Sequence, residues 1–490
     1  NGIPISFERY YTSRWTEIGK RPSQITFDST GYKDSIGYLS TGGGGGGSAI
    51  VEISVKKVYA GSIKESLEPQ PQSYGWTSPW FARIEGSAYF DGTGQAIYFT
   101  IQPDGSYTPS AGAERYMAET GLKIITTPTG LQVRDKSGLR KNFALKADTT
   151  ASYRLASMED EKGNKVTLDY DTSGRLVTIK DATGTPALTF TYAGNFITKI
   201  EDRDGRVVNY TVDSQGRLIE VNGPVGNKSA YEYDSVFDKR ENKNFFRLLK
   251  KTDPEGHITN IAYKAGELVV TKVTEPGGGA RSFVYDFPGR IFYYTDTRGT
   301  TTTYTLNNDS KITSISKGGK QIKKIDYLDN RIEKVTDESG NTLEIQKNEL
   351  YDPIKITDGE GNITKIEYNQ YWKPAKITDP LGGITTFAYN TRQELITITH
   401  PDGSAINLEY DTYGNVTKAT RGQGTETSIT RYEYDTRGNL TKTIDPMGNI
   451  TTYGYDQYGH LNKITDANGQ ATNVTNDIIG RPLSVTDALN

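Results

Sequence analysis

The chain has 490 residues, of which 34% are hydrophobic, and its 57 basic and 60 acidic residues leave a net charge of −3. The charges are interspersed, which excludes the basic stripe of a nucleic-acid-binding protein and a polybasic membrane patch. No run approaches the roughly 18 apolar residues of a transmembrane helix, and the absence of cysteine excludes disulfides, thiol chemistry and cysteine-based metal sites.

Residues 1–150 are predicted to form a β-rich domain that precedes a repeat region. Runs of strand-forming residues at 3–11, 96–101 and 122–126 alternate with Asp-Gly turns. The aromatic residues around Trp76 are candidates for capping the open edge of the repeats. Six consecutive glycines, Gly42–Gly47, indicate a flexible surface loop, with a close-packed contact to a neighbouring molecule as the alternative.

From residue 151 to residue 490 a Tyr-Asp-x-x-Gly motif recurs about every 21 residues, which indicates one supersecondary unit copied many times. The copies with the most complete motif are Tyr170-Asp171 with Gly174, Tyr285-Asp286 with Gly289, Tyr410-Asp411 with Gly414, Tyr434-Asp435 with Gly438, and Tyr455-Asp456 with Gly459. We interpret these residues as structural: Tyr packs in the strand, while Asp and a Gly that tolerates positive φ form the turn.

Each unit carries a second turn signal of the form Asp-Pro-x-Gly, as at Asp253–Gly256, Asp379–Gly382 and Asp445–Gly448. The stretches between turns are short and rich in Thr, Ile, Val, Leu and Tyr, and no stretch has the apolar stripe of a helix. One unit is therefore two strands and two turns. The predicted fold is all-β: a long antiparallel strip of hairpins that coils into a shell or barrel.

The alternation within the predicted strands is imperfect. Leu461 and Ile464 differ in parity, so they cannot share a face of a regular strand. A β-bulge after the turn would bring them to one face. A sheet that is partly buried on both faces would also explain the pattern, and the residues leave both alternatives open.

The Tyr-Asp-x-x-Gly-Arg-Leu and Asp-Pro-x-Gly units resemble RHS/YD repeats. The stretch from Pro4 to Arg14, followed by Gly75-Trp76, resembles the domain that precedes them, so the resemblance covers nearly the whole chain. It implies a β-sheet cocoon of the kind that encloses toxic carboxy-terminal domains in Tc toxins and polymorphic toxins, and that serves adhesion in teneurins. The chain departs from the family in an insertion at about 15–73 and in lacking the terminal core motif, so no protease residue is carried over.

No group of residues rises above background as a catalytic, cofactor-binding or metal site, and we expect no cofactor. His257, His400 and His460 lie in or beside turns, and no pair of them has metal-ligand spacing. Asp202–Gly205 is faintly similar to a calcium loop, but it lacks the 12-residue spacing and the closing Glu. We read it as another repeat turn.

The expected function is a non-enzymatic shell segment of a secreted or cell-surface protein, which encloses or displays its own carboxy-terminal, toxin-like domain. One alternative is an adhesion module that holds a cell-surface carbohydrate or receptor on its tyrosine-rich surface. A weaker alternative is a filament subunit that self-associates through sheet edges. We expect neither nucleic-acid binding nor membrane insertion. Because the chain starts at Asn1 without an initiator Met and stops within a repeat, we expect it to be a piece of a longer protein.

Overall fold

A computed structural model shows a chain that is almost entirely β-structure. Before residue 78 it describes the backbone of five short strands. From Pro79 on, it describes all residues except 92–95, 111–116, 118–120, 148, 150, 162, 239–242, 267–269, 287, 309–311, 329–330, 425, 479 and 488–490. The glycine run and most of the expected insertion lie outside the described residues. Among those described, no helix is long and apolar enough to cross a membrane.

The dominant element is one antiparallel sheet of 38 strands, in which β10 to β43 follow one another in chain order. These strands are β10 (Lys123–Thr127), β11 (Gly130–Arg134), β12 (Arg140–Leu145), β13 (Ser152–Glu159), β14 (Lys165–Tyr170), β15 (Leu176–Lys180), β16 (Pro186–Ala193), β17 (Phe196–Asp202), β18 (Val207–Val212), β19 (Leu218–Asn222), β20 (Lys228–Asp238), β21 (Lys243–Thr252), β22 (Ile258–Tyr263), β23 (Val270–Thr274), β24 (Ala280–Asp286), β25 (Ile291–Thr295), β26 (Thr301–Leu306), β27 (Ile312–Lys317), β28 (Lys320–Tyr327), β29 (Ile332–Asp337), β30 (Thr342–Lys347), β31 (Pro353–Asp358), β32 (Ile363–Tyr368), β33 (Pro374–Thr378), β34 (Ile384–Tyr389), β35 (Leu395–Thr399), β36 (Ala405–Tyr410), β37 (Val416–Gln423), β38 (Glu426–Tyr434), β39 (Leu440–Ile444), β40 (Ile450–Tyr455), β41 (Leu461–Thr465), β42 (Ala471–Asn476) and β43 (Pro482–Thr486). The predicted all-β strip of hairpins is confirmed.

The strip is continuous across the expected domain boundary near residue 150, because β12 pairs with β13 there. A branch of four strands joins the strip at β13, where Tyr153 pairs with Ile84. The branch contains β6 (Arg83–Glu85), β7 (Ala88–Phe90), β8 (Ala96–Ile101) and β9 (Tyr107–Pro109). Among the described residues β43 pairs with β42 alone, so the strip ends in an open edge.

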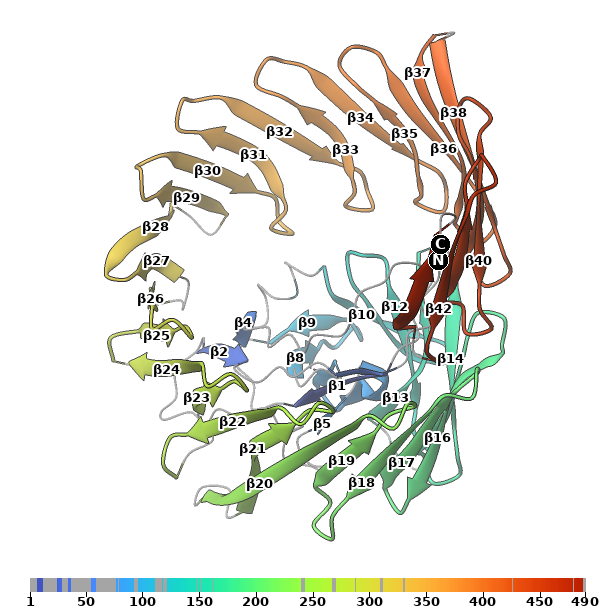
Figure 1. Ribbon diagram of the computed structural model, residues 1–490. Coiled ribbons are helices and arrows are strands. Elements are labelled where there is room, and N and C mark those ends of the chain that lie inside the picture. Colours follow the sequence, from blue (N-terminus) through green and yellow to red (C-terminus); the bar gives the residue numbers. More distant parts are fainter. Residues whose placement is uncertain are drawn as a thin grey trace.

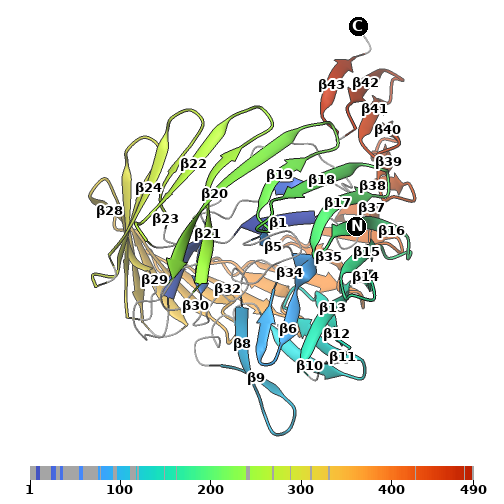
Figure 2. The ribbon, with the colours of Figure 1, turned by 90° about the horizontal axis from the view of Figure 1, so that it is seen from below.

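The remaining amino-terminal elements form small sheets of their own. They are β1 (Phe7–Tyr11), β2 (Gln24–Asp28), β3 (Asp34–Ile36), β4 (Ser54–Val58), β5 (Trp76–Thr77) and the short 3-10 helix η2 (Pro79–Phe81). Strand β1 pairs with both β3 and β5, and β2 pairs with β4. Strands β1 and β5 lie within the curve of the strip in both views (Figures 1 and 2).

In most units a β-bulge follows the turn after the motif tyrosine, which we call the tyrosine-side turn. This bulge explains why Leu461 and Ile464 differ in parity. In β40 and β41, Gly454 pairs with Lys463 but Tyr455 pairs with Leu461, so Asn462 is the extra residue. Leu461 and Ile464 therefore face the same side of the sheet. The same shift occurs where Tyr170 pairs with Leu176 and where Tyr410 pairs with Val416. A bulge, rather than a sheet buried on both faces, explains the pattern.

The strip coils so far that its last strands return to its first. Figure 1 shows the strip curving through a full ring, and contacts between residues more than 200 positions apart join the two passes, as between Lys136 and Asp352. We call β10–β29 the first coil and β30–β43 the second coil. A coiled strip follows from the fixed hand of strand twist, because nearly every strand is added to the same edge.

The concave face and the seam as candidate functional site

One face of the strip carries the motif tyrosines and the apolar residues, and this is the concave face. Ile84, Ile97 and Phe99 of the branch form one buried cluster with strip residues such as Leu155 and Leu218. Figure 1 places β8 and β9 inside the ring. The tyrosine-bearing face therefore points inward, which the sequence alone did not determine.

The opposite, convex face is charged and is held by ion pairs between directly opposed residues of adjacent strands. In three units a Glu and a Lys nine positions apart pair in this way. They are Glu367 with Lys376 at 2.8 Å, Glu409 with Lys418 at 2.7 Å, and Glu433 with Lys442 at 2.8 Å. Exposed pairs of this kind contribute little to stability, roughly 0–1 kcal/mol each. They make the outer surface hydrophilic.

The motif tyrosines connect each unit to the one before it. The Tyr410 hydroxyl donates a hydrogen bond to the Leu395 carbonyl at 2.7 Å, and burial raises the pKa of this phenol, which keeps it a donor. The same contact, to a strand carbonyl in the preceding unit, recurs at Tyr170, Tyr192, Tyr233, Tyr263, Tyr327, Tyr368, Tyr389, Tyr434 and Tyr455. In the copy with Asn476, the side-chain amide makes this bond to Leu461. Sequence reasoning assigned these tyrosines packing alone and missed the ladder.

We expect Tyr410→Phe to lower the free energy of unfolding by about 0.5–1.5 kcal/mol, because the half-buried Leu395 carbonyl loses its hydrogen bond. The control is Tyr413→Phe, because this ring is 62% exposed on the adjacent turn. Urea denaturation of both variants is the measurement. Equal stability of the two variants would show that the ladder contributes nothing.

The motif aspartates close the turns that follow the tyrosines. The Asp171 carboxylate accepts hydrogen bonds from the backbone N–H groups of Ser173 and Arg175, both at 2.9 Å, and from the Arg175 side chain. Gly174 takes φ 79° and donates its N–H to the Asp171 carbonyl. Asp411, Asp435 and Asp456 accept the same backbone bonds, and Gly414, Gly438 and Gly459 take the same positive φ.

The turn after Tyr285 departs from this geometry. Asp286 pairs with Ile291 in unbroken register, and Gly289 donates its N–H to the Asp286 carboxylate at 3.0 Å. The positive φ falls on Arg290 (φ 53°). Gly289 therefore does not adopt the positive φ that the motif predicts. The Tyr285 ring lies 5.0 Å from the Phe292 ring, between centroids.

The turn aspartates are expected to make the stability of the fold decrease at low pH. The N–H of Arg175 holds the pKa of Asp171 below its ordinary value of 3.8, and the Asn362 side chain does so for Asp358. A carboxyl whose pKa is depressed by folding contributes stability above its unfolded pKa, and this contribution is lost as the pH falls through the folded pKa. We expect the melting temperature to be flat down to about pH 5 and to fall below about pH 4. Asp358→Asn should reduce the steepness of that fall; a flat profile at low pH would contradict the assignment.

Ion pairs between the turns of the two coils form a seam. Lys136 and Asp352 approach to 2.6 Å, Glu161 and Lys373 to 2.5 Å, and Asp204 and Arg437 to 3.2 Å. In each pair the first residue lies in a turn of the Asp-x-x-Gly class opposite the tyrosine side, and its partner lies in or directly after a tyrosine-side turn. The row of turns on one side of the first coil therefore stacks on the row of tyrosine-side turns of the second coil.

Arg206 carries a buried charge at the seam. Its side chain is 5% exposed and binds Asp202, itself 6% exposed, at 2.5 Å. The guanidinium also lies 3.5 Å from Nε2 of His460 and from the Ile478 carbonyl, both in the second coil. Asp202 accepts the N–H groups of Asp204 and Arg206, as the other turn aspartates do. The segment with faint similarity to a calcium loop is thus a repeat turn with a buried ion pair.

Family profiles match two parts of the chain. The profile described as Teneurin YD-shell matches residues 149–300, and the RHS Repeat profile matches residues 410–446 and 434–471. These two parts of the chain are RHS/YD repeats. The tyrosine ladder and the Asp-capped turns described above are the RHS/YD units of this chain.

Solved structures similar to this RHS/YD chain include Tc toxin complexes. The Photorhabdus luminescens Tc holotoxin pore is 15% identical, with a TM-score of 0.38 over 84% of this chain and 24% of that one. TcdB2-TccC3 is 12% identical, with a TM-score of 0.37 over 80% of this chain and 29% of that one. The chain spans less than a third of the length of these structures. None of the curated proteins compared with the sequence matches it.

The three histidines of the chain lie in or directly after turns. The His400 N–H donates to the Ser404 carbonyl, in the place that Asp takes in other turns. Asp253, Glu255 and His257 have side-chain ligand atoms within 4.8 Å of one another, the one such group among the described residues that could hold a metal ion. The Asp253 carboxylate, however, accepts the same two turn N–H groups as elsewhere, at 3.0 and 2.8 Å. The group is therefore accounted for as a turn.

The concave face is covered along only part of its length. Most apolar residues that face inward before Tyr293 are buried, whereas from Tyr293 to the end of the described residues Ala419 alone among apolar residues is buried. Ile377, Phe387, Ile398 and Leu408 of the second coil remain half-exposed. The second coil thus presents an apolar, tyrosine-lined surface that the described residues leave open.

Proposed function

We propose that this RHS/YD strip is a non-enzymatic shell segment of a secreted or cell-surface protein, and that its concave face encloses a polypeptide such as its own carboxy-terminal domain. The observation that carries the proposal is the asymmetry of the two faces. The convex face is charged, while the concave face of the second coil is apolar and half-exposed. A large open apolar surface on a soluble protein is a binding surface or an aggregation hazard.

A polypeptide is the occupant that fits this surface best. The half-exposed residues run along the strip as a broad lining rather than as a compact cleft, and the turn carboxylates are occupied by hydrogen bonds from their own turns. Such a lining offers apolar contact without a fixed geometry, which suits an unfolded or loosely folded chain.

Thiol labelling tests the proposal directly because the chain has no cysteine. Thr364 faces inward, since it pairs with Ile356, and the next residue, Lys365, faces outward. Thr364→Cys and Lys365→Cys would each be prepared with an unfolded, apolar polypeptide fused after Asn490, and again with a Gly-Ser segment of equal length.

The expected result is that the apolar fusion slows labelling at position 364 several-fold, relative to the Gly-Ser fusion, and leaves position 365 unchanged. Equal labelling of position 364 in the two fusions would refute enclosure on the concave face. Equal slowing at positions 364 and 365 would show aggregation rather than enclosure.

A further inference from the structure

Three successive tyrosine-side turns break the motif in the same two places. They run from Asn348 to Tyr351, from Asn369 to Trp372, and from Asn390 to Gln393. Each begins with Asn where most units have Asp, and each ends with a non-glycine residue in the left-handed region, at φ 61°, 60° and 59°. Side chains are strained in this conformation, and such strain is concentrated at functional sites.

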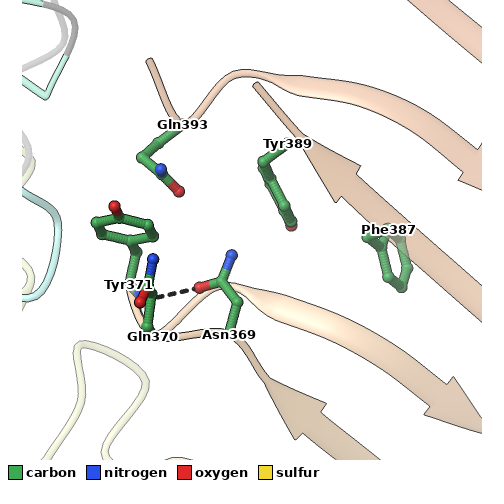
Figure 3. A pocket seen from close by; sticks show the side chains of 6 residues that line it. All are labelled: Asn369, Gln370, Tyr371, Phe387, Tyr389 and Gln393. Carbon is green, nitrogen blue, oxygen red and sulfur yellow. Dashed lines mark hydrogen bonds between the residues drawn. The ribbon is translucent and has the colours of Figure 1, made fainter. Parts of the chain in front are cut away.

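The second and third of these turns border a pocket. Its volume is about 460 Å³, and it is lined by Asn369, Gln370, Tyr371, Phe387, Tyr389 and Gln393 (Figure 3). Figure 3 shows Tyr371 and Gln393 projecting from the two turns, with Tyr389 and then Phe387 to one side, on the strand that leads into the second turn. Phe387 and Tyr389 belong to the concave face, so the pocket continues the apolar lining up to the seam.

No charged side chain lines the pocket, and the Lys373 ammonium, 5.6 Å from the centroid of the Tyr389 ring, is already paired. Lys373 binds Glu161 across the seam at 2.5 Å and the Gln393 carbonyl at 2.7 Å. The Tyr389 hydroxyl donates to the Pro374 carbonyl. Asn in place of Asp at position 369 also removes a carboxylate from the pocket wall. A charged ligand would find no partner here, and burying it would be costly.

The groups that remain can bind an uncharged ligand with both apolar and polar parts. The Tyr371 ring is 46% exposed. The side-chain oxygen Oε1 of Gln393 is buried and has no hydrogen-bond partner, so it is an acceptor without a donor. Carboxamides beside aromatic rings match the alternation of amide groups and apolar side chains in a peptide.

The turn between the pocket and the seam is held from the other coil. The Lys123 ammonium lies 5.4 Å from the centroid of the Trp372 ring, a cation–π contact across the seam. With the Glu161–Lys373 pair, this contact fixes the turn that presents Tyr371. The turn is therefore held in place before a ligand binds, which reduces the ordering that binding requires.

We propose that this pocket anchors an uncharged, extended stretch of the enclosed polypeptide. A prolyl or aliphatic side chain fits between the Tyr371 and Tyr389 rings, and a backbone N–H of the same stretch donates to Oε1 of Gln393 once this buried group has turned toward the pocket. The proposal rests on the proposed enclosing function and adds to it a fixed point of attachment with a defined preference for uncharged sequence.

Photo-cross-linking tests the anchor. A photoreactive phenylalanine analogue would replace Tyr371 in one variant and Tyr413 in the other, because Tyr413 occupies the same place in a turn that keeps its glycine, Gly414. The probe is a fused unfolded segment rich in Pro, Leu and Ser, and the comparison probe has Glu in place of Leu. We expect several-fold more cross-linking from position 371 than from position 413, with the uncharged probe alone.

A second variant separates the anchor from the stability of the fold. Gln393→Gly removes both the strain and the acceptor, so we expect the melting temperature to rise while cross-linking from position 371 falls several-fold. Unchanged cross-linking in Gln393→Gly, or equal cross-linking from positions 371 and 413, would overturn the anchor. If either of these results is obtained while the apolar fusion still slows thiol labelling of Thr364→Cys, the enclosure proposal stands and only the anchor fails. Quenching of Trp372 fluorescence by a neutral glucose oligomer, with no response to the uncharged probe, would also overturn it.

Discussion

Arg206→Ala is expected to lower the free energy of unfolding by about 3–5 kcal/mol, because it leaves the buried carboxylate of Asp202 without its partner. Both side chains are about 95% removed from solvent, at 5% and 6% exposure. The variant also removes the contacts of the guanidinium with His460 and with the Ile478 carbonyl, which join the two coils.

The matched control is Arg217→Ala. Arg217 holds the same position after a turn aspartate and binds Asp213 at 2.6 Å, but it lies on the tyrosine side of the first coil and is 25% exposed. We expect a cost of about 1 kcal/mol or less for this variant. Calorimetry gives the difference in stability, and hydrogen exchange in the turn at 456–460 shows whether the seam has opened. An equal loss in both variants, with no change in exchange at that turn, would mean that the seam contributes nothing.

Leu218→Ala is expected to cost about 2–5 kcal/mol, because the Leu218 side chain is completely buried and its removal leaves a cavity. The matched control is Leu461→Ala, at the same position after its turn but half-exposed in the second coil. There we expect about 1 kcal/mol, since part of the side chain already contacts water.

Hydrogen exchange resolved by segment is the measurement for this pair, because stacked repeats open locally rather than all at once. Leu218→Ala should accelerate exchange in β18–β20, and Leu461→Ala should have a small effect in β40–β42. An equally large effect at Leu461 would show that the concave face of the second coil is covered, which would remove the main support for the proposed enclosure.

The local features of the fold could be predicted because each depends on residues only a few positions apart. The Asp and Gly of Tyr170-Asp171-x-x-Gly174 meet within one turn, so their spacing determines the turn hydrogen bonds. The parity of Leu461 and Ile464 limited the possibilities to two, of which the bulge is the correct one. The turn after Tyr285 differs from the prediction because the same motif can also close with the positive φ one residue later, at Arg290.

The candidate site could not be predicted because its residues are distant in the chain. Nothing near Lys136 indicates that Asp352 is its partner, and nothing near Arg206 indicates His460. The Asn-for-Asp changes at 348, 369 and 390 were visible in the sequence as breaks in the motif. A comparison of the units with one another could have identified them as candidates, although not the pocket that two of them border.

The sequence by itself determined the all-β class, the repeat of two strands and two turns, and the structural role of the motif aspartates, because these depend on contacts within one hairpin. The tertiary structure alone decided which face is concave, which coil the described residues leave uncovered, and which charges meet at the seam. Those features depend on the cumulative twist of many strands, a small angle per strand that brings residues more than 200 positions apart into contact.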